Sequence, residues 1–334
     1  MAENALLKVL LDEGSYLSVD GMNSCGIEAG LGTVLSRPVC VLSFSQVVKA
    51  AALSKMQRLL DKALATGTPL LLLFSEKEKS EVKDLALIQQ RIIRLSGVCP
   101  IIALLEKDAG EVAKLLLPFA DFRFYASGIR ERTSCDVQAL DLPGAIEGLR
   151  TLLSFLPLNC AENAPLLQVA DNNLSTLQTN ASAQEIIAYI ADGSAKFELY
   201  RDTTTQLSFA RVGGRSVGMI ACAQSELPVH AARFIQFCDC YALPAVFVTE
   251  QPLSLYPMQL FMLAQATIPK VCLGPTGSMT SLFDIRIGIE GTQDDVYDIL
   301  LPAHAIRMQL INALELLSVK RDVLPPHKHG NLPV

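Results

Sequence analysis

The sequence predicts an α/β protein made of two similar domains, in which parallel strands are covered by helices. Three observations support this: strand patterns alternate with helical patterns, the series occurs twice, and 334 residues suffice for two domains. The chain is 50% apolar and 19% charged, with a mean hydropathy of +0.34. Such a composition supplies apolar surface for a large core and for an oligomer interface.

In the first half, short apolar runs bounded by turn residues predict strands, and apolar residues at helical spacing predict helices. Strands are expected at residues 36–44, 68–74, 99–106 and 119–125, and helices at 50–67, 85–97 and 144–157. The order of these segments indicates repeated strand–helix units, which favour a parallel sheet.

The second half repeats this order. Strands are expected at 214–222, 243–250, 268–274 and 282–290, and helices at 230–242, 257–267 and 305–318. Arg37 corresponds to Arg215 at an offset close to 175 residues, and Asp121 and Asp284 occupy equivalent points. We therefore predict an N-terminal domain at 1–160, a linker rich in Asn, Ser and Thr at 161–195, and a C-terminal domain at 196–334.

Several classes of protein are excluded by charge and patterning. The net charge of −6 with no basic block argues against a nucleic-acid partner. The start of the chain lacks a secretory signal pattern, and the uncharged stretch 251–269 contains three prolines, so no membrane span is expected. Nine scattered cysteines without a CxxC pair indicate reduced thiols in the cytoplasm and no metal site; Cys238 and Cys240 should face different sides of a helix.

Several stretches resemble the carboxyltransferase subunits of acyl-CoA carboxylases and biotin-dependent acyl-CoA decarboxylases, of the propionyl-CoA carboxylase beta and glutaconyl-CoA decarboxylase alpha type. They are LLDEGSYLSVD, RSVGMIA, AARFIQFCDCYALPAVFV, ATIPKV and the tail INALELLSVKRDVLPPHKHGNLPV. The resemblance implies two tandem crotonase-like (ClpP/crotonase) domains of repeated ββα units. It also implies oligomers in which acyl-CoA is held mainly by the first domain and carboxybiotin by the second, with no covalently bound cofactor.

The resemblance further implies that each domain stabilises an oxyanion with backbone N–H groups from a glycine pair at a helix start. After the strand at 99–106 this chain has one glycine, Gly110, flanked by Asp108 and Glu111. Gly110 is therefore interpreted as a vestigial acyl-CoA oxyanion position, since carboxylates at a helix start would occupy or repel the anion.

In the second domain, Gly277 and Ser278 stand where the family's glycine pair would be, and a short helix is expected through Leu282. Two interpretations remain open. The pair could supply catalytic oxyanion donors, or it could form a plain turn with Thr276 or Ser278 as the N-cap.

Other polar residues have competing interpretations. The charged run 75–84 is either a solvated helix face or a CoA-phosphate site using Lys77, Lys79 or Lys83. Gly213 and Gly214 predict a hairpin turn. Further candidates are Ser75, Glu250 and Asp284 as general acid or base groups, His230 as a capping or surface residue, and His327 and His329 as metal ligands or part of a docking tail.

The loop at 223–229 is shorter than the loop that the family uses near biotin, and the segment after Asp284 lacks the family's long insertion. These losses predict a carboxyltransferase-fold subunit with degraded active-site loops, acting as a non-catalytic or partly catalytic subunit. One alternative is an active carboxyltransferase or decarboxylase completed by a partner subunit. Another is an acyl-CoA-binding module without turnover. Expected partners are further copies of the chain, a catalytic carboxyltransferase chain, or a biotin carrier protein.

Overall fold

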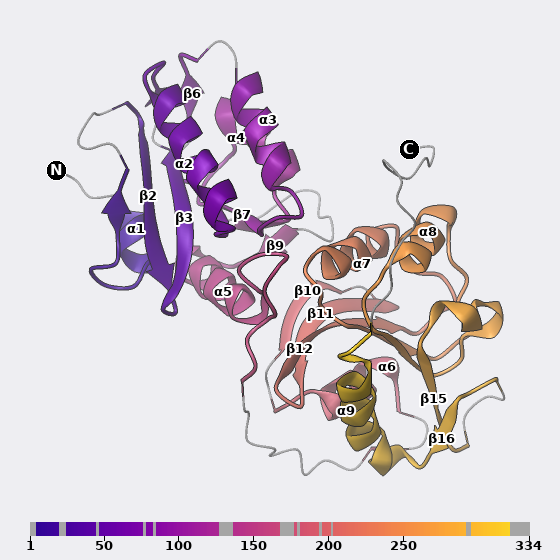
Figure 1. Cartoon of the computed structure of the whole chain (residues 1–334). Coiled ribbons are helices and arrows are strands. Elements are labelled where there is room, and N and C mark those ends of the chain that lie inside the picture. The colour runs from indigo at the N-terminus through magenta and orange to yellow at the C-terminus, as the bar shows by residue number, and fades with distance from the viewer. Residues whose placement is uncertain are drawn as a thin grey trace. The chain divides into compact units, whose positions relative to one another are not determined.

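A computed structural model describes residues 5–19, 25–44, 47–75, 78–82, 85–126, 136–167, 177–178, 181–193, 196–201, 203–291 and 295–320. The chain divides into two compact units, Met1–Asn163 and Ala164–Val334. Each unit contains a seven-stranded sheet covered by helices (Figure 1). The predicted α/β class with two similar domains is confirmed.

The first unit is built on a sheet whose strands follow one another in order along the chain. They are β1 (Leu17–Ser18), β2 (Ile27–Val34), β3 (Arg37–Phe44), β5 (Leu70–Phe74), β7 (Ile101–Leu105), β8 (Phe122–Tyr125) and β9 (Asp136–Gln138). The first three pair antiparallel and the rest pair parallel. The helices are α1 (Ala5–Leu10), α2 (Ala52–Thr66), α3 (Ala86–Leu95), α4 (Glu111–Leu116), the 3-10 turn η1 (Leu117–Phe119) and α5 (Leu142–Phe155). A small separate pair joins β4 (Val47–Val48) to β6 (Lys79–Ser80).

The second unit repeats this arrangement. Its strands are β10 (Lys196–Arg201), β11 (Thr205–Val212), β12 (Arg215–Cys222), β13 (Ala245–Thr249), β14 (Lys270–Leu273), β15 (Ile285–Ile289) and β16 (Ile299–Leu301), again antiparallel for the first three and then parallel. Its helices are α6 (Ala183–Ile190), α7 (Ala231–Cys240), α8 (Pro257–Gln265), the 3-10 helices η2 (Gly277–Leu282) and η3 (Ala303–Ala305), and α9 (Ile306–Leu317). No helix of the described residues has the length and apolar character needed to cross a bilayer.

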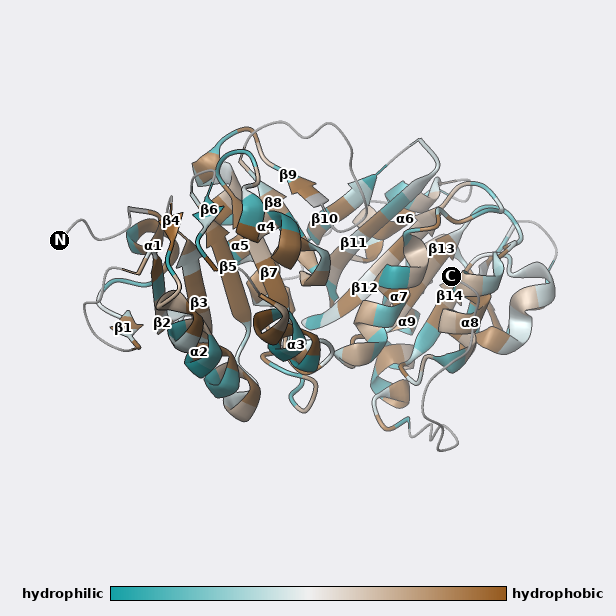
Figure 2. Ribbon diagram, turned by 90° about the horizontal axis from the view of Figure 1, so that it is seen from above, coloured by the Kyte–Doolittle hydropathy of each residue, from teal (hydrophilic) through white to brown (hydrophobic). Residues whose placement is uncertain are grey.

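The parallel strands are apolar on both faces because helices cover both sides of each sheet. In the first unit, α2, α3 and α4 bury one face of β3, β5 and β7, through side chains such as Met56, Leu72 and Phe74. Figure 2 shows these three strands brown over most of their length. In the second unit, α6 and α9 cover one face of the sheet, and on the opposite face Phe234 and Phe237 of α7 stack on Phe209 of β11.

In each unit, an Asp carboxylate bonds the turn of a β-hairpin and contacts an Arg of a later helix. In the first, the Asp12 carboxylate accepts the N–H groups of Leu35 (3.1 Å) and Ser36 (2.7 Å), and Arg150 of α5 contacts it at 3.3 Å. Both turn residues have positive φ, 53° and 61°, which matches the twist of a two-residue hairpin. The carboxylate therefore fixes a turn that these two residues adopt only at a cost.

In the second unit, the Asp192 carboxylate accepts the N–H groups of Gly213 (2.9 Å) and Gly214 (2.6 Å), and Arg307 of α9 contacts it at 2.7 Å. Both glycines have positive φ, so the predicted hairpin turn at this position is confirmed. The repeat seen in the sequence thus extends to individual hydrogen bonds.

The predicted correspondence of Asp121 and Asp284 also appears in the backbone. Asp121 accepts the N–H of Ile101 (2.8 Å), and its own N–H donates to the carbonyl of Ile101 (2.7 Å). Asp284 makes the same reciprocal pair with Lys270, at 2.7 and 2.8 Å. In both units the carboxylate fastens the start of one parallel strand to the next.

The predicted linker, 161–195, contains a helix. Helix α6 begins at a capping box in which Ser182 and Glu185 bond each other's backbone, and it buries Ile186, Ile187 and Ile190 in the core of the second unit. The polar composition that suggested a linker describes only the residues before this helix. The division of the structure therefore falls at Asn163–Ala164, and α6 belongs to the second unit.

Candidate functional site

In the first unit, the backbone after β7 is capped by a buried carboxylate. Gly110 precedes α4, and its N–H donates to the Glu78 carboxylate at 3.2 Å. The N–H of Ala113 donates to the other oxygen of the same carboxylate. The N–H of Glu111 donates to the Glu78 carbonyl at 3.0 Å. With 1% of its surface exposed, Glu78 occupies the donors of the first turn of α4.

Gly110 is needed here because of how closely Glu78 approaches, since its φ of −82° is open to any residue. A Cβ at position 110 would lie 2.2 Å from the carbonyl oxygen of Glu78 and 2.5 Å from its carboxyl carbon. No side chain fits that gap. The glycine therefore makes room for the internal carboxylate, which bonds these donors.

The second unit has a comparable arrangement after β14. The Asp295 carboxylate oxygen Oδ2 accepts the N–H groups of Thr276 (2.6 Å) and Gly277 (3.0 Å), while Oδ1 accepts the N–H of Val296 (2.6 Å). Gly277 opens η2 with a φ of 59°, a left-handed conformation that favours glycine. Two N–H groups converging on one oxygen are the geometry of an oxyanion hole, and here the oxygen belongs to the protein itself.

The environment of Asp295 favours the ionised carboxylate. Burial raises its pKa, but the hydrogen bonds from Gly277, Val296 and Thr276, with the nearby charge of Arg286, outweigh burial and leave the pKa below its ordinary value. Arg286 is itself held by Asp298, with contacts of 2.6 and 3.0 Å. At neutral pH the N–H pair therefore faces a negative charge, which repels any anionic group.

The structure brings together Thr276 and Gly277, whereas the sequence suggested Gly277 and Ser278. Ser278 lies one residue further along η2, and the two bonds to Asp295 Oδ2 come from the residues before it. Neither Thr276 nor Ser278 caps η2 with its side chain. The cap predicted from local sequence is instead supplied by Asp295, eighteen residues after Gly277.

The other polar candidates at strand ends hold the backbone in place. Glu250 accepts the N–H of Ala183 at 2.7 Å and so caps α6. Asp284 bonds the Lys320 ammonium at 2.9 Å besides the Lys270 backbone. Ser75 Oγ lies 3.5 Å from the Phe44 carbonyl. Each of these groups has a structural partner within its own unit.

Of the three histidine candidates, only His230 lies within the described residues. His230 precedes α7 but makes no capping hydrogen bond with its side chain; its ring packs edge-on against Tyr200 at a centroid distance of 5.6 Å. His327 and His329 lie outside the described residues, as do Lys77 and Lys83. Among the residues that the structure describes, no three His, Cys, Asp or Glu side chains are grouped to hold a metal ion.

Sequence reasoning missed both Glu78 and Asp295. The charged run was predicted to be a solvated helix face, and that prediction is wrong for its described part, because residues 79–80 form β6 and pair with β4. This pairing turns Glu78 inward. Alternating acids and bases carry no sign of which carboxylate will be buried, so the local sequence offered no signal. Of the two carboxylates expected at the helix start, Glu111 is the first residue of α4, and its side chain accepts the N–H of Ser80 at 2.9 Å.

Known carboxyltransferase proteins are similar in sequence to this chain. A model of the carboxyl transferase domain family matches residues 127–252. The 12S subunit of methylmalonyl-CoA carboxyltransferase from Propionibacterium freudenreichii subsp. shermanii is 24% identical over 442 aligned residues, covering 92% of this chain and 84% of the relative. The chain is a carboxyltransferase-fold protein related to acyl-CoA carboxylase beta chains. One such relative, the propionyl-CoA carboxylase beta chain of Cereibacter sphaeroides, is 25% identical and aligns with 84% of this chain and 72% of its own length.

Solved structures of similar proteins confirm the fold of this chain. The transcarboxylase 12S structure, a hexamer assembly with hydrolysed methylmalonyl-coenzyme A bound, superposes with a TM-score of 0.79 at 20% identity and covers 98% of this chain. A single-chain long-chain acyl-CoA carboxylase gives 0.74 at 14% identity over 92% of this chain. Both units therefore have the predicted crotonase-like fold.

The 12S subunit contains segments that this chain lacks. The alignment between them extends over 442 positions, more than the 334 residues of this chain, so the 12S subunit carries insertions relative to it. This agrees with the short loops noted in the sequence.

Proposed function

We propose that this chain is a non-catalytic or partly catalytic carboxyltransferase-fold subunit that contributes its scaffold to a larger assembly. The observation that carries the proposal is the internal carboxylate in each unit, Glu78 on the donors of Gly110 and Asp295 on the donors of Gly277. Carboxyl transfer develops negative charge on a thioester oxygen and on the ureido oxygen of biotin. Preorganised N–H groups stabilise such charge only if they are free to receive it.

The residues present do not fit acyl-CoA or carboxybiotin at these two positions. In the first unit, Glu78 fills the space beside Gly110. In the second, the Asp295 charge stands where the developing anion would have to bind. We therefore derive no carboxyl-transfer step for the isolated chain.

The proposed assembly partners are further copies of this chain, a catalytic carboxyltransferase chain, or a biotin carrier protein. The 12S relative, whose solved structure is a hexamer assembly on a multienzyme core, supports such a context. The proposal places the subunit in the cytoplasm, where its free cysteines would stay reduced.

An active enzyme is the second candidate, and one observation favours it. The N–H groups of Thr276 and Gly277 still converge on a single oxygen, so the second-unit donor pair would serve catalysis if a partner subunit displaced Asp295. This candidate requires a partner that displaces Asp295, whereas the first leaves Asp295 on its two donors.

The test is an assay of the purified chain with malonyl-CoA and methylmalonyl-CoA, with and without carboxybiotin. We expect decarboxylation and carboxyl transfer at the rate of the protein-free blank. Turnover that disappears in Gly277→Pro, which removes one donor, would overturn the proposal in favour of the enzyme. Circular dichroism of the variant controls for folding.

A pull-down from the native cell tests the assembly. A biotinylated protein or an intact carboxyltransferase chain recovered with this one supports the scaffold role. Calorimetry with millimolar CoA thioester separates the remaining possibility, an acyl-CoA-binding module: heat of binding without turnover would favour that module over a scaffold.

A further inference from the structure

The described cysteines are free thiols, and they differ in exposure. Cys160 and Cys240 are exposed, whereas the others described are buried: Cys25, Cys40, Cys99, Cys222, Cys238 and Cys272. Because no metal-binding group is formed by the described residues, a cluster of thiols has to be explained by packing or by redox chemistry.

Cys160 lies against the backbone that leads to Cys99. Its N–H donates to the carbonyl of Val98 at 2.9 Å, and the peptide of that carbonyl also contains the nitrogen of Cys99. The Cys99 N–H in turn donates to Leu95 at the end of α3, at 3.2 Å. The two cysteines, 61 positions apart in sequence (160 − 99), are therefore held side by side by main-chain bonds.

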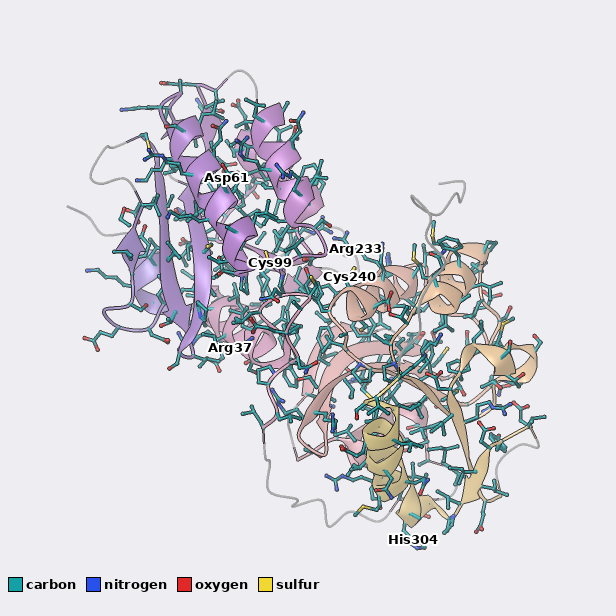
Figure 3. All side chains as sticks on the ribbon, viewed as in Figure 1. Arg37, Asp61, Cys99, Arg233, Cys240 and His304 are labelled. Atoms are coloured by element: carbon teal, nitrogen blue, oxygen red, sulfur yellow. The ribbon has the colours of Figure 1, made fainter. Side chains whose placement is uncertain are left out.

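The turn that carries Cys160 is fixed by its neighbour. The Asn159 side chain accepts the N–H of Ala161 at 3.0 Å and donates to Glu162 at 3.0 Å. It also packs against Gly67, at the end of α2. Cys160 is thus presented to solvent from an anchored position, and Cys99, labelled in Figure 3, has no exposed surface beneath it.

The thiols also influence each other electrostatically. Burial is the main reason why the pKa of the Cys99 thiol is raised to about 12, and the neighbouring Cys40, Asp121 and Cys160 groups contribute to the same shift. The contribution of Cys160 agrees with the main-chain bond that holds its backbone beside that of Cys99. Cys240, the other exposed thiol among the described residues, follows Cys238 by two positions on α7, where the two side chains point in different directions.

We propose that Cys160 and Cys99 form a reversible intramolecular disulfide, with Cys160 as the thiol that reacts first. The bond would fasten the residue three positions before the end of the first unit to the start of β7. Under oxidising conditions the bond would restrain the chain segment that leaves this unit. Its formation does not depend on whether the protein carries out carboxyl transfer.

The reaction takes its oxidising equivalents from a low-molecular-weight disulfide such as oxidised glutathione. The Cys160 thiolate attacks one sulfur, forms a mixed disulfide and expels one thiolate, which takes up a proton. Cys99 then loses its proton to solvent, attacks the Cys160 sulfur and expels the second thiolate. Two protein thiols lose two electrons in total, and one disulfide is reduced to two thiols.

The experiment is to incubate the full-length protein with oxidised glutathione and map its peptides by mass spectrometry without reduction. We expect a peptide pair joined through Cys99 and Cys160, and its release by dithiothreitol. The cross-link should form about tenfold faster for each unit of pH between 7 and 9, because the Cys99 thiolate is the scarce reactant in the second step.

Two variants with exposed substitutions control this result. Cys160→Ser should abolish the cross-link, and Cys240→Ser, at the other exposed thiol, should leave it unchanged. Cys160 recovered only as a glutathione adduct would overturn the proposal. So would a bond between Cys99 and Cys40, or a cross-link that persists in Cys160→Ser.

Discussion

Glu78 and Asp295 each bond two or more backbone N–H groups that a helix start would otherwise leave to solvent or to a ligand. For Asp295 the ionised form is the one that fits, because its hydrogen bonds hold the pKa below the ordinary value of 3.8. A residue of this kind contributes to stability as long as it stays charged.

Asp295→Ala should lower the free energy of unfolding by roughly 1–2 kcal/mol at pH 7, because the N–H groups of Thr276 and Gly277 lose their acceptor. The folded-state pKa is lowered, so the contribution is present above about pH 4 and is lost as the pH falls through the lower folded value. Urea unfolding of the wild type and the variant at pH 7 and pH 3 checks this, with a smaller difference expected in acid.

Asp61→Ala is the matched control for that measurement. Asp61, labelled in Figure 3, lies on α2. It forms a 3.0 Å ion pair with Arg91, and its side chain is 55% exposed. Its loss should change the free energy of unfolding by less than about 0.5 kcal/mol. An Asp295→Ala effect no larger than this would show that the carboxylate is not needed by the backbone it caps.

At the scale of elements, β12 and α7 approach so closely that a glycine is needed between them. A Cβ at Gly218 would lie 2.5 Å from the Cys238 sulfur and 3.2 Å from the Phe234 ring. Cys238 is fully buried. The stretch of sequence that most resembles the carboxyltransferase subunits is thus also a place where strand and helix are packed without spare volume.

Gly218→Ala should therefore destabilise the protein by about 1–3 kcal/mol through overpacking. Adding Cys238→Ala removes the sulfur that the new methyl group meets. We expect the double variant to lose less unfolding free energy than the sum of the two single losses, by at least about 0.5 kcal/mol in a double-mutant cycle. Additive effects would contradict the close contact.

The helices and strands could be predicted from the sequence, whereas the two internal carboxylates, Glu78 and Asp295, could not. Strands such as β5 follow from a short apolar run bounded by turn residues, and helices such as α2 follow from apolar residues at period 3.6, so in both cases the signal lies in the segment itself. Glu78 becomes buried only because β6 pairs with β4, a contact between segments 32 residues apart at Val47 and Lys79 (79 − 47). Asp295 reaches Gly277 in the same non-local way, so neither carboxylate could be assigned from its neighbours in sequence.

At the scale of the whole molecule, the two units share a strand order and a set of polar contacts but differ in how deeply these contacts are buried. Asp192 has 2% of its side chain exposed and Arg307 12%, whereas Asp12 has 27% and Arg150 23%. The same Asp–Arg contact is therefore more deeply buried in the second unit than in the first.

Asp192→Ala should cost about 3–5 kcal/mol of unfolding free energy, because it removes the buried carboxylate that bonds Arg307 and the N–H groups of Gly213 and Gly214, where water has little access. Asp12→Ala should cost roughly 1–2 kcal/mol, since water reaches its partners. Urea unfolding of the two variants side by side checks the order. Equal losses would mean that burial does not set the strength of this contact.

The two internal carboxylates also bear on the ancestry of the chain. Glu78 follows β5, the second of the five consecutive parallel strands β3, β5, β7, β8 and β9, whereas Asp295 follows β15, the fourth of the matching series β12, β13, β14, β15 and β16. A substitution made before the gene duplicated would have been inherited at the same place in both halves. The two acids stand at different places in the repeat, so a single substitution inherited by both halves does not account for them, and the same kind of contact is built differently in each half.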